Sequence, residues 1–215
     1  AETALYNTVE NNIVNGKPLI YLEDESDVIV DIQAGEIILI NCRNTKIKNQ
    51  NITDTDVAIL VWNSEGTIVN STIKNNYLYG ILVASFGLNN TIYGSTIENN
   101  SEGIYVLSGW ANISQNTIIN DHVYICSNGH AYIVNNTIMV GDCAIYLSYV
   151  TNTVIRGNTI QNFTTGIYIS GSDNVDVAEN ILKNNTDGIY LDESSQITIS
   201  QNKIYNGTRG IYLWP

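Results

Sequence analysis

The sequence repeats one four-residue phrase at a period of 22 residues, as Gly166-Ile167-Tyr168-Ile169, Gly188-Ile189-Tyr190-Leu191 and Gly210-Ile211-Tyr212-Leu213. The same place in earlier repeats is held by the phrases that begin at Ala144, His122, Gly103, Gly80, Ala58 and Leu19. Internal self-similarity of this length is typical of solenoids, in which each repeat contacts only its neighbours.

A second phrase follows in each full-length repeat and reads Asn, any residue, Ile or Leu, any residue, Asn. It occurs at 158–162, 180–184 and 202–206, and a shorter apolar stretch such as Val154-Ile155 stands between the two phrases. Three short segments of period 2 in about 22 residues, separated by Asn, Gly, Ser and Thr, predict strands rather than helices. We therefore expect an all-β, single-stranded parallel β-helix of nine to ten coils, with three sheets around one apolar column.

Side-chain alternation along the expected strands assigns the interior. One interior column should consist of Ile59, Ile81, Ile104, Val123, Ile145, Ile167, Ile189 and Ile211. A second should consist of Ile52, Ile73, Ile97, Ile118, Ile138, Ile160, Leu182 and Ile204. The paired asparagines should lie at the bends, where their amides can hydrogen-bond to the backbone and to one another across a rung spacing of ~4.8 Å. We interpret these asparagine columns as scaffold.

The two phrases resemble the right-handed parallel β-helix repeat, and most closely the NosD-like repeats of bacterial and archaeal surface or periplasmic proteins. Residues 144–213 follow that consensus closely, and a looser match covers nearly all of 11–213. The resemblance implies a right-handed solenoid. It selects no activity, because similar repeats occur in polysaccharide lyases and hydrolases, in epimerases, in surface proteins and in an accessory protein of copper assembly.

The composition is that of one acidic domain. The chain has 215 residues, 44% of them hydrophobic, and a formal charge of −12 with a pI near 4.3. An acidic surface repels phosphate groups, which argues against nucleic acid and anionic membranes as partners. No stretch approaches the ~18 apolar residues of a membrane helix, so we expect no membrane insertion. Three scattered cysteines make no disulfide framework.

One tyrosine follows the interior residue of the first phrase on six consecutive coils. By strand alternation the side chains of these tyrosines point outward; they are Tyr105, Tyr124, Tyr146, Tyr168, Tyr190 and Tyr212. We call this column the tyrosine strip, and Tyr21 lies on it further up. Three interpretations remain open: stacking between neighbouring strands, burial under a partner chain, and contact with sugar rings.

A catalytic β-helix needs carboxylates gathered on one outer face. Glu102 and Asp121 are expected in the same column on adjacent coils, with His122 beside them and Asp142 nearby. These three residues, Glu102, Asp121 and His122, are the best acid–base candidates in the chain. Asp and His are also ordinary turn residues, and no Lys or Arg is expected close to them.

Metal ligands are grouped in two places. The acidic turn 23–27 could bind Ca²⁺ weakly through oxygen ligands, but a solvated loop is the interpretation that we favour. Both histidines, the only methionine and two cysteines fall between 121 and 143, and such soft ligands suit Cu(I). His130 and Met139 should lie on different faces from Cys143, however, so we predict no metal site and no bound cofactor.

The ends of the sequence suggest how the solenoid is used. Residues 1–10 could cap the first coil, whereas 210–213 begin a new coil that Trp214-Pro215 do not cap. An open solenoid end can pair with another chain, so head-to-tail association into filaments is expected. We therefore expect a single domain over 1–215 that acts as a non-catalytic structural or binding module, either extracellular, on the cell surface or in the periplasm. Its partner would be a glycan or another protein chain. The alternatives are a polysaccharide lyase or hydrolase, or a fragment of one, and a NosD-like copper-handling protein.

Overall fold

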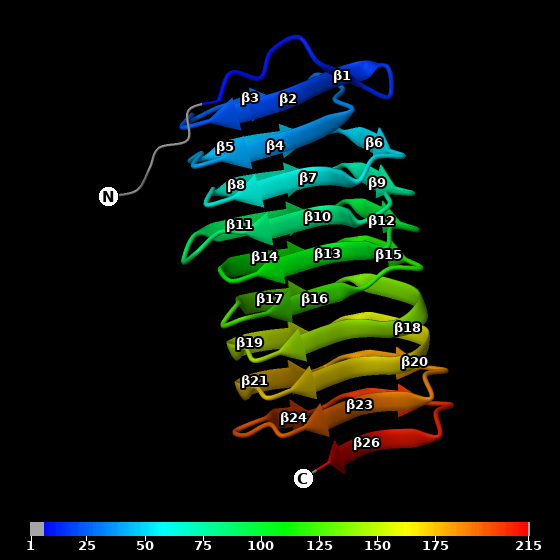
Figure 1. Ribbon diagram of the computed structural model, residues 1–215. Helices are drawn as coiled ribbons and strands as arrows, with labels where there is room; N and C mark the ends of the chain where they lie inside the picture. Colours follow the sequence, from blue (N-terminus) through cyan, green and yellow to red (C-terminus); the bar gives the residue numbers. More distant parts are fainter. Residues whose placement is uncertain (1–6, 215) are drawn as a thin grey trace.

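The structure, a computed structural model, describes residues 7–214, and the chain forms a right-handed parallel β-solenoid of about eight turns. Figure 1 shows the strands stacked as rungs from the N-terminal to the C-terminal end. Every regular element in the described residues is a strand. The predicted fold class is confirmed. The predicted cap at 1–10 lies partly outside the described residues.

The strands lie on three faces. Face 1 carries the Gly-Ile-Tyr-Leu phrases and comprises β2 (Lys17–Glu23), β4 (Glu36–Ile40), β7 (Val57–Trp62), β10 (Tyr79–Ala84), β13 (Glu102–Leu107), β16 (Val123–Cys126), the second halves of β18 (Thr137–Ser148) and β20 (Thr159–Ser170), β23 (Asp187–Asp192) and β26 (Arg209–Trp214). Face 2 is a separate sheet of nine strands, β3 (Ile29–Val30), β5 (Thr45–Lys48), β8 (Gly66–Val69), β11 (Asn89–Tyr93), β14 (Trp110–Ser114), β17 (His130–Val134), β19 (Thr151–Arg156), β21 (Asp173–Ala178) and β24 (Thr198–Ser200).

Face 3 carries the asparagine phrases. It comprises β6 (Asn51–Thr53), β9 (Thr72–Lys74), β12 (Thr96–Glu98), β15 (Thr117–Ile119), the first halves of β18 and β20, β22 (Ile181–Lys183) and β25 (Lys203–Tyr205). Because β18 and β20 run through the corner without a break, faces 1 and 3 belong to one sheet rather than to two. A short strand, β1 (Ile13–Val14), pairs antiparallel with β2 at the N-terminal end.

The number of turns is slightly below the predicted nine to ten. The first turn carries only the two-residue strand β3 after β2, and β26 begins a turn that has no further strand in the described residues. The prediction counted both partial turns. It also missed β4, which lies between β2 and β7 and pairs Ile38 with Tyr21 and with Leu60.

The interior columns are buried along nearly their whole length. In the first column, the residues from Ile59 to Ile189 have no exposed surface, and in the second the same holds from Ile52 to Leu182. Each such side chain contributes roughly 1.5–3 kcal/mol to stability. The prediction was wrong for Ile211, which is 50% exposed because β26 pairs with β23 on one side and no other strand within residues 7–214 covers it.

A column of buried asparagines lines the corner between faces 2 and 3. Its members are Asn116, Asn136, Asn158 and Asn180, which are buried, and Asn202, which is half-buried. In each step the backbone N–H and the side-chain Nδ2 of one asparagine donate to Oδ1 of the next, at 2.9–3.1 Å. Nδ2 also donates to a backbone carbonyl of the preceding turn, as from Asn158 to Ile133 at 2.7 Å. The buried amides are therefore satisfied by the repeat itself.

Candidate functional site

One corner of the solenoid is shorter than its neighbour. Between faces 3 and 1, Ile118 is followed by Val123 after five residues, whereas their partners in the next turn, Ile138 and Ile145, are seven residues apart. The corner between β15 and β16 therefore lacks two residues that the following turn has. A solenoid with one short corner cannot pack evenly against its neighbours at that point, and we expect a hollow there.

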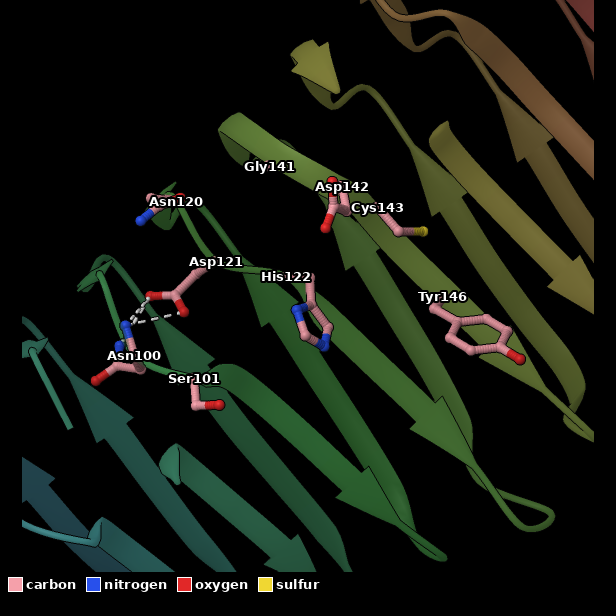
Figure 2. A pocket seen from close by; sticks show the side chains of 9 residues that line it. All are labelled: Asn100, Ser101, Asn120, Asp121, His122, Gly141, Asp142, Cys143 and Tyr146. Atoms are coloured by element: carbon pink, nitrogen blue, oxygen red, sulfur yellow. Dashed lines mark hydrogen bonds between the residues drawn. The ribbon is translucent and has the colours of Figure 1, made fainter. Parts of the chain in front are cut away.

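A groove of about 510 Å³ lies at this short corner (Figure 2). Residues of three successive turns line it: Asn100, Ser101, Asn120, Asp121, His122, Gly141, Asp142, Cys143 and Tyr146. Two of the three predicted acid–base residues, Asp121 and His122, are among them. Asp142 and Cys143, which the sequence placed near Asp121, line the groove as well. Tyr146 joins the groove to the tyrosine strip.

Asp121 occupies a place that three other turns give to asparagine, namely Asn76, Asn100 and Asn185. Counted back from Val123, which pairs with Ile104, it aligns with Glu102. Counted forward from Ile118, which pairs with Ile97, it aligns with Asn100. Because the corner is short, both counts end at Asp121. The hydrogen bonds of its carboxylate are made with Asn100. The predicted column of Glu102 and Asp121 agrees with the count from Val123, and Asp121 is in addition hydrogen-bonded to Asn100.

The carboxylate of Asp121 is 4% exposed and accepts hydrogen bonds from Asn100. The donors are the backbone N–H, at 3.1 Å from each carboxylate oxygen, and Nδ2, at 2.8 Å. The pKa of Asp121 is raised from 3.8 to about 7, chiefly by burial. The hydrogen bonds from Asn100 lower this pKa, and the nearby charges of Glu102 and Glu98 add to the increase. The groove therefore contains a carboxyl group that can carry a proton near neutral pH.

Glu102 forms an ion pair with His122, whose Nε2 lies against Oε2 of Glu102. Both side chains are partly exposed. Oε2 itself is buried and has no hydrogen bond of good geometry within residues 7–214, and the His122 imidazole lies directly against it. The three predicted residues thus meet as an ion pair and a neighbouring buried acid, an arrangement that can exchange protons with a bound ligand.

The cysteines are used as hydrogen-bond donors within the fold. Burial raises the pKa of the Cys143 thiol to about 12, so it is a poor nucleophile, and its Sγ donates to the carbonyl of Ile145 at 3.4 Å. Cys126 donates to the Tyr105 hydroxyl at 3.4 Å. In residues 7–214 no group of three or more His, Cys, Asp and Glu side chains is arranged to hold a metal ion.

The tyrosine strip runs down face 1 in register. Its six rings pair turn by turn, with centroids 4.6–5.0 Å apart, and Tyr79 extends the strip at 5.2 Å from Tyr105. In the middle, Tyr146 stacks on Tyr124 and Tyr168 with interplanar angles of 3° and 14°. Stacked rings cover one another's faces, so this part of the strip presents ring edges and hydroxyl groups to a ligand.

Sequence reasoning did not find Asn100, Ser101 or Tyr146 as parts of the groove, and it did not find the aromatic residues of face 2 described below. The one signal for the groove was the 19-residue interval between Ile104 and Val123, where full repeats have 22. Of the acidic turn 23–27, Asp27 accepts a hydrogen bond from Asn44 at 2.6 Å. No helix in the described part of the chain is long and apolar enough to cross a membrane.

Solved structures with a similar fold include a surface adhesin of Streptococcus pneumoniae, PfbA, with a TM-score of 0.50 and 14% identity over 93% of this chain and 77% of that one. The Agl-KA catalytic domain has a TM-score of 0.44 and 17% identity, over 86% of this chain and 52% of that one. The A-module of the Azotobacter vinelandii mannuronan C-5 epimerase AlgE4 has a TM-score of 0.35 and 14% identity, over 91% and 79%. At these identities the likeness concerns the fold alone.

No curated protein matches the sequence. The chain does match the family described as right handed beta helix region, over residues 2–138 and 89–214, and these two segments together span nearly its whole length. The register, the buried columns and the three faces agree with that match. The chain therefore belongs to the right-handed β-helix family.

Proposed function

We propose that this chain is a non-catalytic binding module of an exported or cell-surface protein, and that its groove holds a neutral or basic glycan. The observation that carries the proposal is the short corner between β15 and β16, which lacks two residues that the following turn has and where the groove lies. A volume of about 510 Å³ is within the ~300–1,000 Å³ of typical ligand sites.

The polar lining of the groove suits a carbohydrate. Hydroxyl, amide and carboxyl groups of Ser101, Asn120 and Asp142 can exchange hydrogen bonds with sugar hydroxyls. The carboxylates of Asp142 and Glu102, together with the charge of −12, disfavour an acidic glycan. Beyond the groove, the hydroxyl edges of the tyrosine strip offer an extended contact for the next sugar units.

A surface location is part of the proposal. PfbA, which is described as a surface adhesin, shares the fold, and the resemblance to NosD-like repeats suggests surface or periplasmic proteins. Head-to-tail association of chains is a separate part of the proposal, and sedimentation of the purified chain over a range of concentrations measures it apart from glycan binding.

Three oligosaccharides of equal length test the proposal: chitohexaose, which is neutral, its deacetylated and basic counterpart, and hexagalacturonate, which is acidic. Calorimetry should show binding of the first two and none of the third at roughly millimolar concentration. Tyr146→Phe keeps the ring stack and removes one hydroxyl, so binding should weaken roughly three- to tenfold. Asp142→Ala should weaken the basic hexamer most.

Tyr205→Phe is the matched control. Tyr205 is 49% exposed on face 3, away from the groove, and its substitution by Phe removes the same kind of hydroxyl group. Binding by this variant should equal that of the unmodified chain. The proposal fails if hexagalacturonate binds as well as the other two, if none of the three binds, or if Tyr146→Phe and Asp142→Ala both leave the affinities unchanged.

One observation favours an enzyme as the second candidate function. A carboxyl group with a pKa of about 7 lines the same groove as His122, which is paired with Glu102, and such a pair of groups can act as acid and base. Incubation with the three hexamers and detection of new reducing or unsaturated ends tests this. Activity that disappears in both Asp121→Asn and Glu102→Gln would replace the binding proposal by an enzymatic one.

A further inference from the structure

A second aromatic surface lies on face 2, away from the tyrosine strip. Trp110 and Asn112 project outward from β14 with the buried Ala111 between them, and Tyr132 projects from β17, the next strand. Trp110 is 37% and Tyr132 48% exposed. Phe86, on the loop before β11, is 61% exposed. We call Trp110, Tyr132, His130 and Phe86 the Trp110 platform.

Trp110 stands between two hollows. The first, of about 330 Å³, is lined by Asn89, Asn90, Thr91, Trp110, Ala111, Asn112 and Tyr132. The second, of about 270 Å³, is lined by Phe86, Gly87, Ser108, Gly109, Trp110, Ser127, Asn128 and His130. Each hollow is lined by at least two aromatic side chains. The first is at the small end of the ~300–1,000 Å³ range for ligand sites, and the second is slightly below it. That size suits a single ring of a chain-like ligand in each hollow.

The backbone before Trp110 is built for a close approach. Gly109 has a φ of +120°, and a Cβ at this position would lie 2.4 Å from the carbonyl oxygen of Ser85. Only glycine allows the loop of this turn to lie against the loop of the preceding turn. This close contact fixes the position of the backbone at the start of β14, where Trp110 stands.

His130 holds the Trp110 ring from one side. The two ring centroids are 4.7 Å apart, and His130 Nδ1 lies 2.7 Å from the carbonyl oxygen of Thr151. A carbonyl only accepts, so Nδ1 carries the proton and Nε2 of the neutral ring is free to accept a hydrogen bond. On the opposite neighbouring strand, the residue paired with Trp110 is the short Asn89. Unlike the stacked tyrosines of face 1, the indole therefore has a face that no neighbouring ring on its column covers.

The lining of both hollows carries no formal charge when His130 is neutral, although the chain as a whole carries −12. The polar groups around the rings are amides and hydroxyls, such as those of Asn112, Asn128 and Ser127. An exposed indole face with amide and hydroxyl donors beside it matches a sugar ring, which has an apolar C–H face and a rim of hydroxyls. A charged ligand would find no counter-charge here.

We propose that the Trp110 platform is a binding site for a neutral polysaccharide, with successive sugar units in the two hollows on either side of Trp110. This site is separate from the groove of the proposed function, which lies at the corner between faces 3 and 1. The two sites differ in their predicted response to charge, because only the groove is lined by carboxylates.

The test uses chains that carry Asp142→Ala, so that binding in the groove is weakened, and three neutral probes of six units: cellohexaose, laminarihexaose and mannohexaose. At least one should bind with one-to-one stoichiometry in calorimetry, with an affinity that is insensitive to salt. Trp110→Ala should lower that affinity at least about tenfold, and Tyr132→Ala should lower it less. Tyr77→Ala, which removes a ring that is 67% exposed elsewhere, should leave it unchanged.

Circular dichroism of each variant shows whether the solenoid is intact, and Tyr132→Ala provides the comparison should Trp110→Ala disturb the fold. The proposal is overturned if none of the three probes binds at roughly millimolar concentration, or if Trp110→Ala and Tyr132→Ala bind as well as Tyr77→Ala. If Tyr146→Phe loses binding and Trp110→Ala binds fully, the groove is the binding site and the proposal of a site at the Trp110 platform fails. If Trp110→Ala loses binding and Tyr146→Phe binds fully, the platform is the binding site and the proposal of a site in the groove fails.

Discussion

Replacing Asn158 with alanine is expected to lower the free energy of unfolding by about 3–5 kcal/mol. Asn158 has no exposed surface, and its Oδ1 accepts from the backbone N–H and from Nδ2 of Asn136 at 2.9 and 3.0 Å. Its Nδ2 donates to the Ile133 carbonyl at 2.7 Å and to Asn180 Oδ1 at 3.0 Å. Alanine therefore leaves donors and acceptors on both neighbouring turns buried without partners.

Chemical denaturation followed by circular dichroism measures the effect, with Asn51→Ala as the control. Asn51 is exposed in β6, so its replacement should change the unfolding free energy by about 0.5 kcal/mol or less. Because each turn of a solenoid contacts only its neighbours, hydrogen exchange in Asn158→Ala should increase first around β17, β19 and β21. Equal losses in the two variants would show that the buried column contributes no more than exposed amides do.

The architecture could be predicted because its signals recur. The spacing of Tyr146, Tyr168 and Tyr190 implies the observed register directly, since a residue that recurs every 22 positions in a solenoid pairs with its own copies. The strand β4 escaped the prediction because Ile37, Ile38 and Leu39 lack the Gly and Tyr of the phrase and because the turn before it is only 17 residues long. Strands that carry the recurring phrase can therefore be predicted from the sequence, whereas a strand in a single irregular turn cannot.

The sites were less predictable for the same reason. An irregular corner changes which residues align, and Asp121 could be matched to Glu102 or to Asn100 until its hydrogen bonds were known. Strand alternation predicted that the tyrosines face outward, but it contains nothing about the stacking of their rings. The Trp110 platform is visible in the sequence as Trp110-Ala111-Asn112 and His130-Ala131-Tyr132 on adjacent turns. These segments lack the Gly-Ile-Tyr-Leu phrase on which the prediction of face 1 depends.

Replacing Asp121 with asparagine is expected to stabilise the chain at pH 8 and to change little at pH 4. Folded Asp121 keeps its proton up to a pKa of about 7, whereas the unfolded chain releases it near 3.8. Between these values the folded state binds more protons, so the contribution of Asp121 to stability falls as the pH rises and levels off above pH 7. At about 1.4 kcal/mol for each tenfold change in proton affinity, the loss is on the order of 4 kcal/mol.

Asparagine avoids this loss, because its Oδ1 can accept from Asn100 and its Nδ2 can donate to a backbone carbonyl, as Asn100 Nδ2 does to Ile73 at 3.2 Å. We expect Asp121→Asn to exceed the unmodified chain by roughly 2–4 kcal/mol at pH 8, measured by denaturation at pH 4 and pH 8. Asp142→Asn, an exposed change in the same groove, should show no such difference between the two pH values. A gain of equal size at both would mean that Asp121 keeps an ordinary pKa in the folded chain. If the pH-dependent gain is found, an acid stands at a cost in stability where three other turns hold the amides of Asn76, Asn100 and Asn185. Such a departure is expected where the residue serves binding or chemistry.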